Sequence, residues 1–516
     1  MRFDCIVVGS GHAGSCAALS AVENGCKEVL IVDKCPPEWV GGNGYFTAGA
    51  HRTVHGGLQD LLPIVKNVTP EQADKIDMEP YTADEFKSDI MRLGGGQSDG
   101  PLVDAVVNGS RDAIGWLASH VGIPFIFSFH RQAYEVDGRQ KFWGGLALSV
   151  EDGGKGLIAA HQKALKKAGV RVWFNTPAIR LIVEEKIVKG LVVRKDGVDT
   201  LFECDAVVLA AGGYESSSQL RAQHLGEEWQ RAKASGIATT VRGTPYNTGD
   251  GFLIARGVGA KLTGDWSGCH STCWDAGAPS DAGERTLTNQ YTKSGYPLGL
   301  MINVKGNRFV DEGEDFRNYT YAKFGRAILQ QPEGVAFQIW DSKVIGTLRK
   351  EEYGDGVTEK ILADTLEGLA DKLAEKGLES KAQLLDTVTK FNEAVNLHRA
   401  EHPGLRFDPA IKDGMSTMSL APPKSNWALP LDRAPFMAVK VTCGITFTFG
   451  GLAIDPATAG VVSDSCSQTI EGLYCTGEMV GGLFHTNYPG GSGLTAGAVF
   501  GRKAGLGAAK RGGTRS

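Results

Sequence analysis

The most constraining feature of this 516-residue chain is a glycine-rich turn between two short apolar segments near its start. Residues 3–8 predict a buried strand, which runs into a Gly-x-Gly-x-x-Gly turn at residues 9–14. A second apolar segment, residues 29–32, predicts another strand that ends at Asp33. The three glycines permit a tight turn, a close approach of the backbone to a pyrophosphate, and close packing of the following helix. The pattern predicts a βαβ unit that binds a dinucleotide.

The acidic residue after the second strand indicates which dinucleotide fits. A carboxylate at the position of Asp33 accepts hydrogen bonds from a ribose hydroxyl. No arginine lies nearby in the sequence to receive a 2′-phosphate. FAD or NAD is therefore favoured over NADP.

The end of the chain predicts a second contribution to the same domain. Residues 472–478 form an apolar strand that ends in Gly477 and Glu478, and a glycine-rich segment then leads to an apolar helix from Leu494. A helix N-terminus carries about half a positive charge, which would stabilise the negative charge of a reduced flavin. The alternative is a glycine-rich turn that caps a core helix without touching a ligand.

The pattern of elements favours an α/β fold with an inserted domain. Residues 206–211 are apolar throughout, as in a strand buried on both faces of a parallel sheet. Short strands are expected before it, the later ones forming a small antiparallel set, at residues 170–174, 179–184, 187–194 and 200–203. Between residues 240 and 330 glycine, threonine, asparagine and aromatic residues are mixed, and 357–400 predicts two amphipathic helices. This middle block is interpreted as an inserted domain.

Composition excludes several classes of partner. The net charge of −5 is small and unclustered, which argues against nucleic acid or an anionic membrane as a partner. No apolar run approaches the roughly 18 residues of a membrane-spanning helix, and the first strand follows Arg2 directly, without a signal peptide. We expect a soluble, cytoplasmic protein without a transmembrane segment.

The ten cysteines contain no Cys-x-x-Cys pair, which predicts reduced thiols rather than a disulfide framework. Cys269, His270 and Cys273 are spaced like metal ligands, but a structural zinc site would need a fourth partner. We therefore expect no metal site.

Five segments of the sequence are distinctive both in composition and in their order along the chain. They are the turn at 9–14, the Gly-Gly-Asn loop at 41–43, and residues 207–213, 305–312 and 472–493. In this order, over nearly the whole chain, they resemble the flavoprotein family of fumarate reductase, succinate dehydrogenase, L-aspartate oxidase and 3-ketosteroid dehydrogenase. Within that family, residues 266–270, 315–323, 443–451 and 487–491 are most similar to the FAD-dependent tricarballylate dehydrogenases.

The resemblance implies a Rossmann-like FAD-binding domain, with a parallel sheet and a small antiparallel sheet, and an inserted α+β capping domain. The expected boundaries are 1–264 and 447–516 for the FAD-binding domain and 265–446 for the capping domain. Asn43 stands where covalent members carry a histidine, so the implied FAD is non-covalent. The implied FAD-binding residues are Gly9, Gly11, His12, Ala13, Gly14, Asp33, Lys34, Gly41, Gly42, Asn43, Ala211, Gly212, Gly213, Gly477, Glu478, Gly491, Gly493 and Leu494.

The implied reaction is hydride exchange between a carbon next to a carboxylate and flavin N5, with proton transfer at the neighbouring carbon. Arg317 aligns with the proton-transferring arginine of fumarate reductases, and Glu314 and Asp315 are candidates for tuning it. A guanidinium is normally always protonated, so the alternative is that Arg317 clamps a substrate carboxylate. His270 aligns with a histidine that binds a substrate carboxylate, and Tyr488 is the third catalytic candidate.

Departures from the family pattern bear on the substrate. Residues 446–448 are Thr-Phe-Thr where fumarate reductases carry His-His-Thr. Tyr488 replaces their carboxylate-binding arginine, and residues 291–292 are Tyr-Thr in place of their Thr-Glu pair. Fumarate itself is therefore a doubtful substrate, and a tyrosine at this place is similar to the ketosteroid dehydrogenases.

Four functions remain open: a dehydrogenase of the tricarballylate to cis-aconitate type, a fumarate-type ene-reductase, a ketosteroid-like or natural-product desaturase, and a flavin-binding protein without catalysis. The basic side chains of Arg242, Arg285, Arg317, Lys323 and His270 favour a small carboxylic acid over a steroid. The sequence holds no haem motif and no iron–sulfur cysteine set. A dehydrogenase of this kind therefore needs an external electron acceptor: a carrier protein, a quinone or dioxygen.

Overall fold

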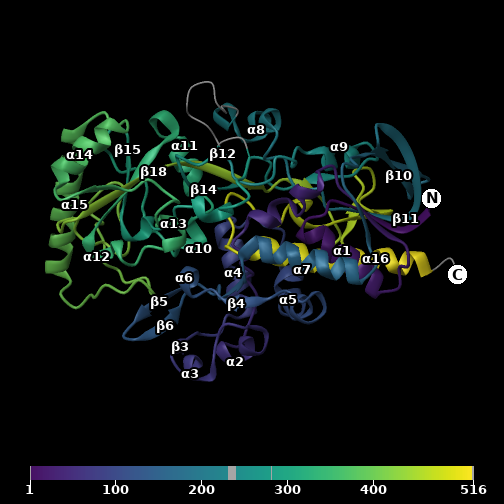
Figure 1. The fold of residues 1–516 in the computed structure, drawn as a ribbon, viewed down its shortest axis with the longest axis horizontal. Helices are drawn as coiled ribbons and strands as arrows, with labels where there is room; N and C mark the ends of the chain where they lie inside the picture. The colour runs from purple at the N-terminus through teal and green to yellow at the C-terminus, as the bar shows by residue number, and fades with distance from the viewer. Residues whose placement is uncertain (1, 230–239, 280–281, 514–516) are drawn as a thin grey trace.

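The first strand of the chain lies inside an eight-stranded mixed sheet (Figure 1). The computed structural model describes residues 2–229, 240–279 and 282–513. Parallel pairing joins the strands β1 (Arg2–Val8), β2 (Val29–Val32), β8 (Arg171–Trp173), β11 (Val198–Leu209) and β21 (Thr469–Cys475). The antiparallel strands are β9 (Ala178–Glu184), β10 (Ile187–Lys195) and β20 (Gly460–Val462). The predicted α/β class is confirmed.

The antiparallel strands extend this sheet instead of forming a separate one. Residues 200–203 and 206–211, expected as two strands, belong to the single strand β11. Its first half pairs with β10 and its second half with β1, Glu203 facing a residue on each side. The polar break at Asp205 does not end the strand, because Arg2 Nη2 donates to its carboxylate at 2.6 Å.

Two helices place the start of the chain beside its end. Helix α1 (His12–Glu23) follows the glycine-rich turn and packs along α16 (Ser492–Gly513) (Figure 1). A Cβ at Gly505 would lie 2.4 Å from the carbonyl oxygen of Ala17, so only glycine permits this approach. The N-termini of α1 and α16 therefore reach the same edge of the sheet.

The segment between β2 and β8 forms a layer below the eight-stranded sheet (Figure 1). Its helices are α2 (Leu58–Leu61), α3 (Pro70–Ala73), α4 (Ala83–Leu93), α5 (Gly100–Trp116), α6 (Phe129–Gln132) and α7 (Gly153–Lys167). Its strands are β3 (Ile76–Asp77), β4 (Phe125–Phe127), β5 (Ala133–Val136), β6 (Arg139–Phe142) and β7 (Leu148–Val150).

A second, six-stranded sheet is centred on β18 (Phe436–Thr448). Its other strands are β12 (Thr240–Val241), β14 (Cys269–Asp275), β15 (Leu300–Asn303), β16 (Ala336–Asp341) and β17 (Ile361–Ala363). The two expected amphipathic helices, α14 (Leu366–Glu375) and α15 (Lys381–Glu401), lie at the far left of Figure 1 and share a core with this sheet. The predicted domain boundaries at 264 and 446 stay a prediction.

The remaining helices lie along the chain either between β11 and β14 or between strands of the six-stranded sheet. The helices are α8 (Ser218–Leu225), α9 (Asp250–Arg256), α10 (Arg317–Thr320), α11 (Phe324–Leu329), α12 (Ser342–Ile345) and α13 (Lys350–Tyr353), and β13 (Leu262–Thr263) pairs with β19 (Gly451–Leu452). All ten cysteines are free, as predicted. Within the described residues, no helix has the length and apolar character that crossing a membrane requires.

Candidate cofactor and substrate cavity

One cavity runs from the edge of the eight-stranded sheet to the edge of the six-stranded sheet. Glycine-rich segments form one end of it, and arginine side chains gather at the other. The three predicted catalytic residues, Arg317, His270 and Tyr488, all line this cavity. The predicted cofactor residues line it too, except Gly14 and Gly213.

The two exceptions have packing roles. A Cβ at Gly14 would lie 2.1 Å from the carbonyl oxygen of Gly9, so this glycine lets α1 pack against the turn. A Cβ at Gly213 would lie 2.1 Å from a carboxylate oxygen of Glu478. Neither glycine lines the cavity, but each allows the close packing of residues that do.

The first end has the features that FAD requires. Gly9 has a φ of +108°, which favours glycine, and a Cβ at Gly11 would meet only the backbone of Gly41, at 3.5 Å or more. No side chain caps the N-terminus of α1, which leaves this helix end for a pyrophosphate. The Asp33 carboxylate is held in place by Ser10, whose amide donates to it at 2.8 Å and whose hydroxyl donates at 2.6 Å.

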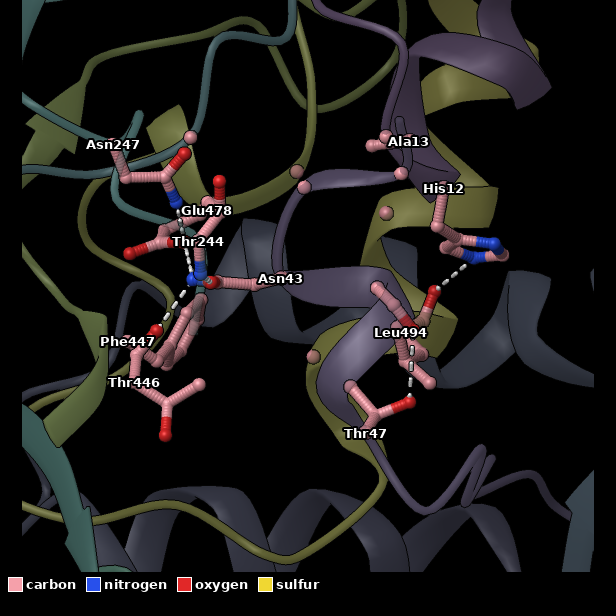
Figure 2. A pocket seen from close by; sticks show the side chains of 18 of the residues that line it. His12, Ala13, Asn43, Thr47, Thr244, Asn247, Thr446, Phe447, Glu478 and Leu494 are labelled. Atoms are coloured by element: carbon pink, nitrogen blue, oxygen red, sulfur yellow. Dashed lines mark hydrogen bonds between the residues drawn. The ribbon is translucent and has the colours of Figure 1, made fainter. Parts of the chain in front are cut away.

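Figure 2 shows His12, Ala13 and Leu494 on one side of the cavity and Asn43 and Glu478 on the other. The residues present therefore fit FAD.

Asn43, which lines the cavity, is hydrogen-bonded to a residue of the six-stranded sheet and to one that follows a strand of the eight-stranded sheet. Its amide nitrogen donates to Glu215 Oε1 at 2.6 Å and to the carbonyl oxygen of Thr446, at the end of β18, at 2.5 Å. Burial raises the pKa of Glu215 and of Glu478, and the charge of Glu215 raises that of Glu478 further. The buried pair therefore holds a proton that an isolated carboxylate would lose.

The second end of the cavity concentrates positive charge. Four guanidinium groups line it, those of Arg131, Arg242, Arg317 and Arg349. Nε and Nη1 of Arg242, and Nε and Nη2 of Arg349, are buried and have no hydrogen-bond partner among the residues that the structure describes. Burial lowers the pKa of Arg242 and of Arg349, and the neighbouring arginines lower that of Arg349 further. An anion would satisfy these donors and relieve the repulsion between them.

A buried carboxylate, that of Glu352, faces these arginines. Glu352 Oε1 forms an ion pair with Arg349 Nη1 at 2.7 Å and accepts a hydrogen bond from Arg131 Nη2 at 3.3 Å. Burial alone would raise the pKa of Glu352, but the charges of Arg349, Arg131 and Arg317 lower it to about 2. The cavity end keeps a positive excess, because Glu352 and the neighbouring Glu351 stand against four guanidinium groups.

Arg317 is connected to this carboxylate through a hydroxyl. Its Nη1 donates to Ser294 Oγ at 3.1 Å, and Ser294 Oγ donates to Glu352 Oε2 at 2.5 Å. The guanidinium carbon of Arg317 lies 5.3 Å from the centre of the Trp143 ring. A continuous path of hydrogen bonds therefore runs from Arg317 to Arg131, whose side chain is 23% exposed.

His270 and two tyrosines form the opposite wall. Tyr488 Oη lies 3.0 Å from His270 Nδ1 and 2.9 Å from Tyr321 Oη. Burial, together with the charge of Arg242, lowers the pKa of His270, so its ring is neutral. His270 Nε2 is buried, and no described residue forms a hydrogen bond with it. If Tyr488 donates to Nδ1, Nε2 carries a hydrogen and is a donor at the cavity wall.

Four charged residues that the sequence analysis expected at the substrate end do not line the cavity. Lys323 and Glu314 pair with each other at 2.5 Å, and Asp315 pairs with Arg92 at 2.7 Å. The expectation that Glu314 or Asp315 tunes Arg317 is therefore wrong, because basic groups on other elements attract both carboxylates. The guanidinium of Arg285 stacks 3.5 Å from the centre of the Tyr45 ring and does not line the cavity.

Sequence reasoning missed several residues at this end, namely Arg131, Ser294, Tyr321, Arg349 and Glu352. They come from short helices and turns, which carry no recognisable motif. Tyr321 alone lies inside a segment that the resemblance had singled out, residues 315–323.

Comparisons with known proteins cover almost the whole chain. Residues 4–494 match the family model described as an FAD binding domain. The chain is 30% identical to a probable fumarate reductase of Shewanella frigidimarina over 509 residues, which are 98% of this chain and 74% of that protein. It is 27% identical to the 3-oxosteroid 1-dehydrogenase of Mycolicibacterium smegmatis over 597 residues, 98% of this chain and 97% of that protein.

A solved structure shares the fold. The open conformation of a flavocytochrome c3 fumarate reductase superposes with a TM-score of 0.68 at 27% identity, covering 99% of this chain and 78% of that chain.

Proposed function

Because the chain belongs to the FAD-binding flavoprotein family that includes fumarate reductase, we propose that it oxidises a carbon–carbon single bond in a small polycarboxylic acid. It is an FAD-dependent oxidoreductase that acts on CH–CH groups. The proposed reaction is of the tricarballylate to cis-aconitate type, in which the bond that becomes double lies next to a carboxylate. The electrons leave to an external acceptor such as a carrier protein, a quinone or dioxygen.

The unpartnered arginine donors carry this proposal. A buried donor without an acceptor costs about 1–3 kcal/mol, and more when it is charged. Arg242 and Arg349 each leave two such nitrogens in the cavity wall. Carboxylates accept from guanidinium groups in a bidentate manner, so two substrate carboxylates would satisfy both arginines. A steroid carries no group of this kind, which supports an acidic substrate over an apolar one.

The cofactor end supplies the redox chemistry, since bound FAD would accept the hydride. Gly9, Gly11 and the N-terminus of α1 would hold its pyrophosphate, and Asp33 its ribose. The first turn of α16, which includes Leu494, would face the flavin ring and stabilise the negative charge that it gains.

Arg317 would take the proton that leaves the neighbouring carbon. It first gives its Nη1 proton to Ser294 Oγ while Ser294 passes its own proton to Glu352 Oε2. Substrate carboxylates would offset the charges of Arg131 and Arg349, which raises the pKa of Glu352 and eases this transfer. Arg131, at the exposed end of the path, would release one of its protons to solvent and take up the proton of Glu352 in its place. The alternative, that Arg317 only clamps a carboxylate, predicts a change in KM without a large change in kcat.

Reduction of an unsaturated acid is the second candidate. The identity to a probable fumarate reductase favours it, and the same residues would act in reverse, with Arg317 giving the proton.

Anaerobic mixing separates the candidates. Purified holoenzyme is mixed in turn with tricarballylate, succinate and a 3-ketosteroid while the absorbance of oxidised flavin is followed. Loss of absorbance with tricarballylate, and none with the steroid, supports the proposal. Bleaching by the steroid alone contradicts it. If no compound bleaches the flavin, but cis-aconitate or fumarate reoxidises chemically reduced enzyme, the reductase replaces the dehydrogenase.

A further inference from the structure

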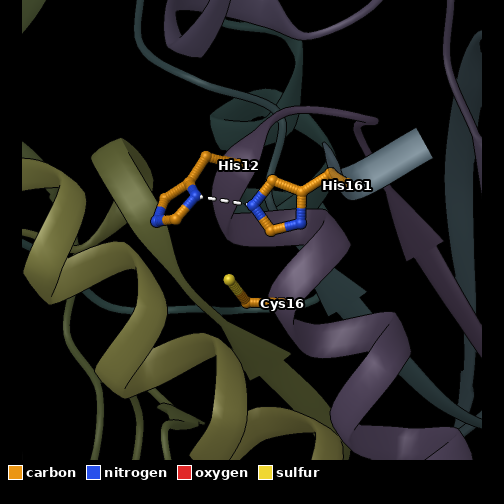
Figure 3. A group of neighbouring side chains, drawn as sticks. All are labelled: His12, Cys16 and His161. Atoms are coloured by element: carbon orange, nitrogen blue, oxygen red, sulfur yellow. Dashed lines mark hydrogen bonds between the residues drawn. The ribbon is translucent and has the colours of Figure 1, made fainter. Parts of the chain in front are cut away.

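A cluster of three buried side chains lies directly behind the cofactor end of the cavity. His12 and Cys16 are one turn apart on α1, and His161 faces them from α7, which packs against α1 (Figure 3). One ligand atom from each residue lies within 4.8 Å of the other two. Within the part of the chain that the structure describes, no other group of three or more histidine, cysteine or acidic side chains is arranged in this way.

The hydrogen bonds of His12 fix which of its nitrogens is free to bind a ligand. Nε2 lies 3.0 Å from the carbonyl oxygen of Leu494, which can only accept, so Nε2 carries the hydrogen. Nδ1 therefore presents a lone pair, and it lies 2.9 Å from Nε2 of His161. A histidine that binds a metal commonly donates its second N–H to a backbone carbonyl in this manner.

We propose that His12 Nδ1, Cys16 Sγ and His161 Nε2 are three ligands of a divalent cation of the zinc class, with a water molecule as the fourth ligand. Two imidazoles and a thiolate are the ligands that zinc prefers, whereas calcium and magnesium require oxygen. No spacing in the sequence indicates this site, because His161 lies far along the chain from the other two residues.

The spacing of the two imidazole nitrogens needs only a small adjustment. Zinc–nitrogen bonds of about 2.05 Å at a tetrahedral centre separate the two nitrogens by about 3.3 Å. The two rings therefore move apart by about 0.4 Å from their 2.9 Å hydrogen bond. On binding, the proton between the rings moves to His161 Nδ1, a buried atom that has no partner within the described part of the chain, and the Cys16 thiol releases its proton to solvent.

Such an ion would act as a structural link and not as part of the redox reaction. It would join α1 to α7 and fix the ring of His12, whose other nitrogen holds the Leu494 carbonyl in the first turn of α16. Only His12 of the three lines the cavity, so bound FAD would cover the ion. The ion must then enter during folding or before FAD.

Cobalt tests the site, because a Co²⁺–thiolate bond gives a charge-transfer absorption and tetrahedral Co²⁺ absorbs at longer wavelengths than oxidised flavin. The protein is produced in cobalt-supplemented medium, and cobalt per FAD is measured in the holoenzyme by mass spectrometry. We expect about one cobalt per chain with these bands, about a tenfold loss in Cys16→Ala and His161→Gln, and no loss in Cys26→Ala. Cys26 is a buried thiol that does not belong to the cluster.

Two results would overturn the site. One is wild-type holoenzyme that holds less than about a tenth of a cobalt per chain and lacks the charge-transfer band. The other is Cys16→Ala that keeps its cobalt in full. The wild-type spectrum decides the question even if a variant fails to fold, and substrate turnover does not enter the measurement.

Discussion

The two ends of the cavity are built in different ways. The cofactor end uses backbone atoms of short contiguous motifs, as at Gly9, where a positive φ favours glycine. The substrate end uses long side chains, such as those of Arg131 and Arg349, that come from separate short elements. A large cofactor with a fixed shape can be recognised by backbone geometry, whereas the substrate is recognised by the placement of charge. Substitutions at the substrate end can therefore change substrate preference without affecting cofactor binding at the cofactor end.

Replacing Arg317 should have the largest effect and should separate the two ends. Arg317→Gln is expected to lower kcat by about a thousandfold, because the proton-transferring group is lost, while FAD content stays unchanged. Rates of flavin reduction and the FAD-to-protein ratio measure both quantities. A similar kcat with a raised KM would show that Arg317 is only a clamp.

Glu352 tests whether the hydrogen-bonded path matters. Glu352→Gln should lower kcat by about a hundredfold, because Ser294 loses a charged acceptor, and should flatten the pH dependence of kcat. Glu314→Gln, which removes a carboxylate paired with Lys323, is the matched control and should leave both unchanged. An unaltered pH profile in Glu352→Gln, with normal FAD content, would exclude the path.

Arg242 tests substrate binding apart from chemistry. Arg242→Gln should raise KM for a polycarboxylate by about tenfold to a hundredfold with little change in kcat, since a charged hydrogen bond contributes about 1.5–3 kcal/mol. Arg194→Gln, at an exposed arginine paired with Asp199, is the control. Steady-state kinetics at constant ionic strength measure the difference. An unchanged KM would remove Arg242 from the substrate end.

Gly11 tests the cofactor end. Gly11→Ala should fold, since the added Cβ would lie 3.5 Å from the nearest atom outside the neighbouring residues, but should weaken FAD binding by about tenfold. Gly100→Ala adds a Cβ in open space at the start of α5 and is the control. FAD titration of the apoprotein measures the change. Undiminished affinity would contradict the place assigned to the pyrophosphate.

Glu478 should show the smallest effect. Its raised pKa means that wild-type stability falls as pH rises above the ordinary value of about 4.5 towards the folded value. Glu478→Gln has no such titrating proton. The melting temperature of the variant minus that of the wild type should therefore increase with rising pH, by about 2 °C or more. A constant difference across pH would contradict the shared proton.

The cofactor end could be predicted almost completely from sequence. The spacing of Gly9, Gly11 and Gly14 and the acid at Asp33 are local features, and local backbone geometry decides whether they fit a dinucleotide. The helix that starts at Leu494 was found for the same reason, and it begins two residues earlier, at Ser492.

The substrate end could be predicted only in part. The resemblance pointed to Arg317, His270 and Tyr488, but Ser294 and Glu352 meet Arg317 only through tertiary packing. Proximity in sequence was misleading, since two acidic residues lie within three positions of Arg317 and both pair elsewhere. Which carboxylate faces an arginine depends on the packing of whole elements, and no spacing rule gives it.

The most direct test of the central claim is to count the carboxylates that the enzyme requires. Anaerobic rates of flavin reduction by tricarballylate, succinate and butyrate, which carry three, two and one carboxylate, give kcat/KM for each acid. We predict that kcat/KM falls by about tenfold or more with each carboxylate removed, because a pair of arginine donors loses its acceptor. Equal values for the three acids, or faster reduction by a 3-ketosteroid, would contradict a substrate end that recognises charge.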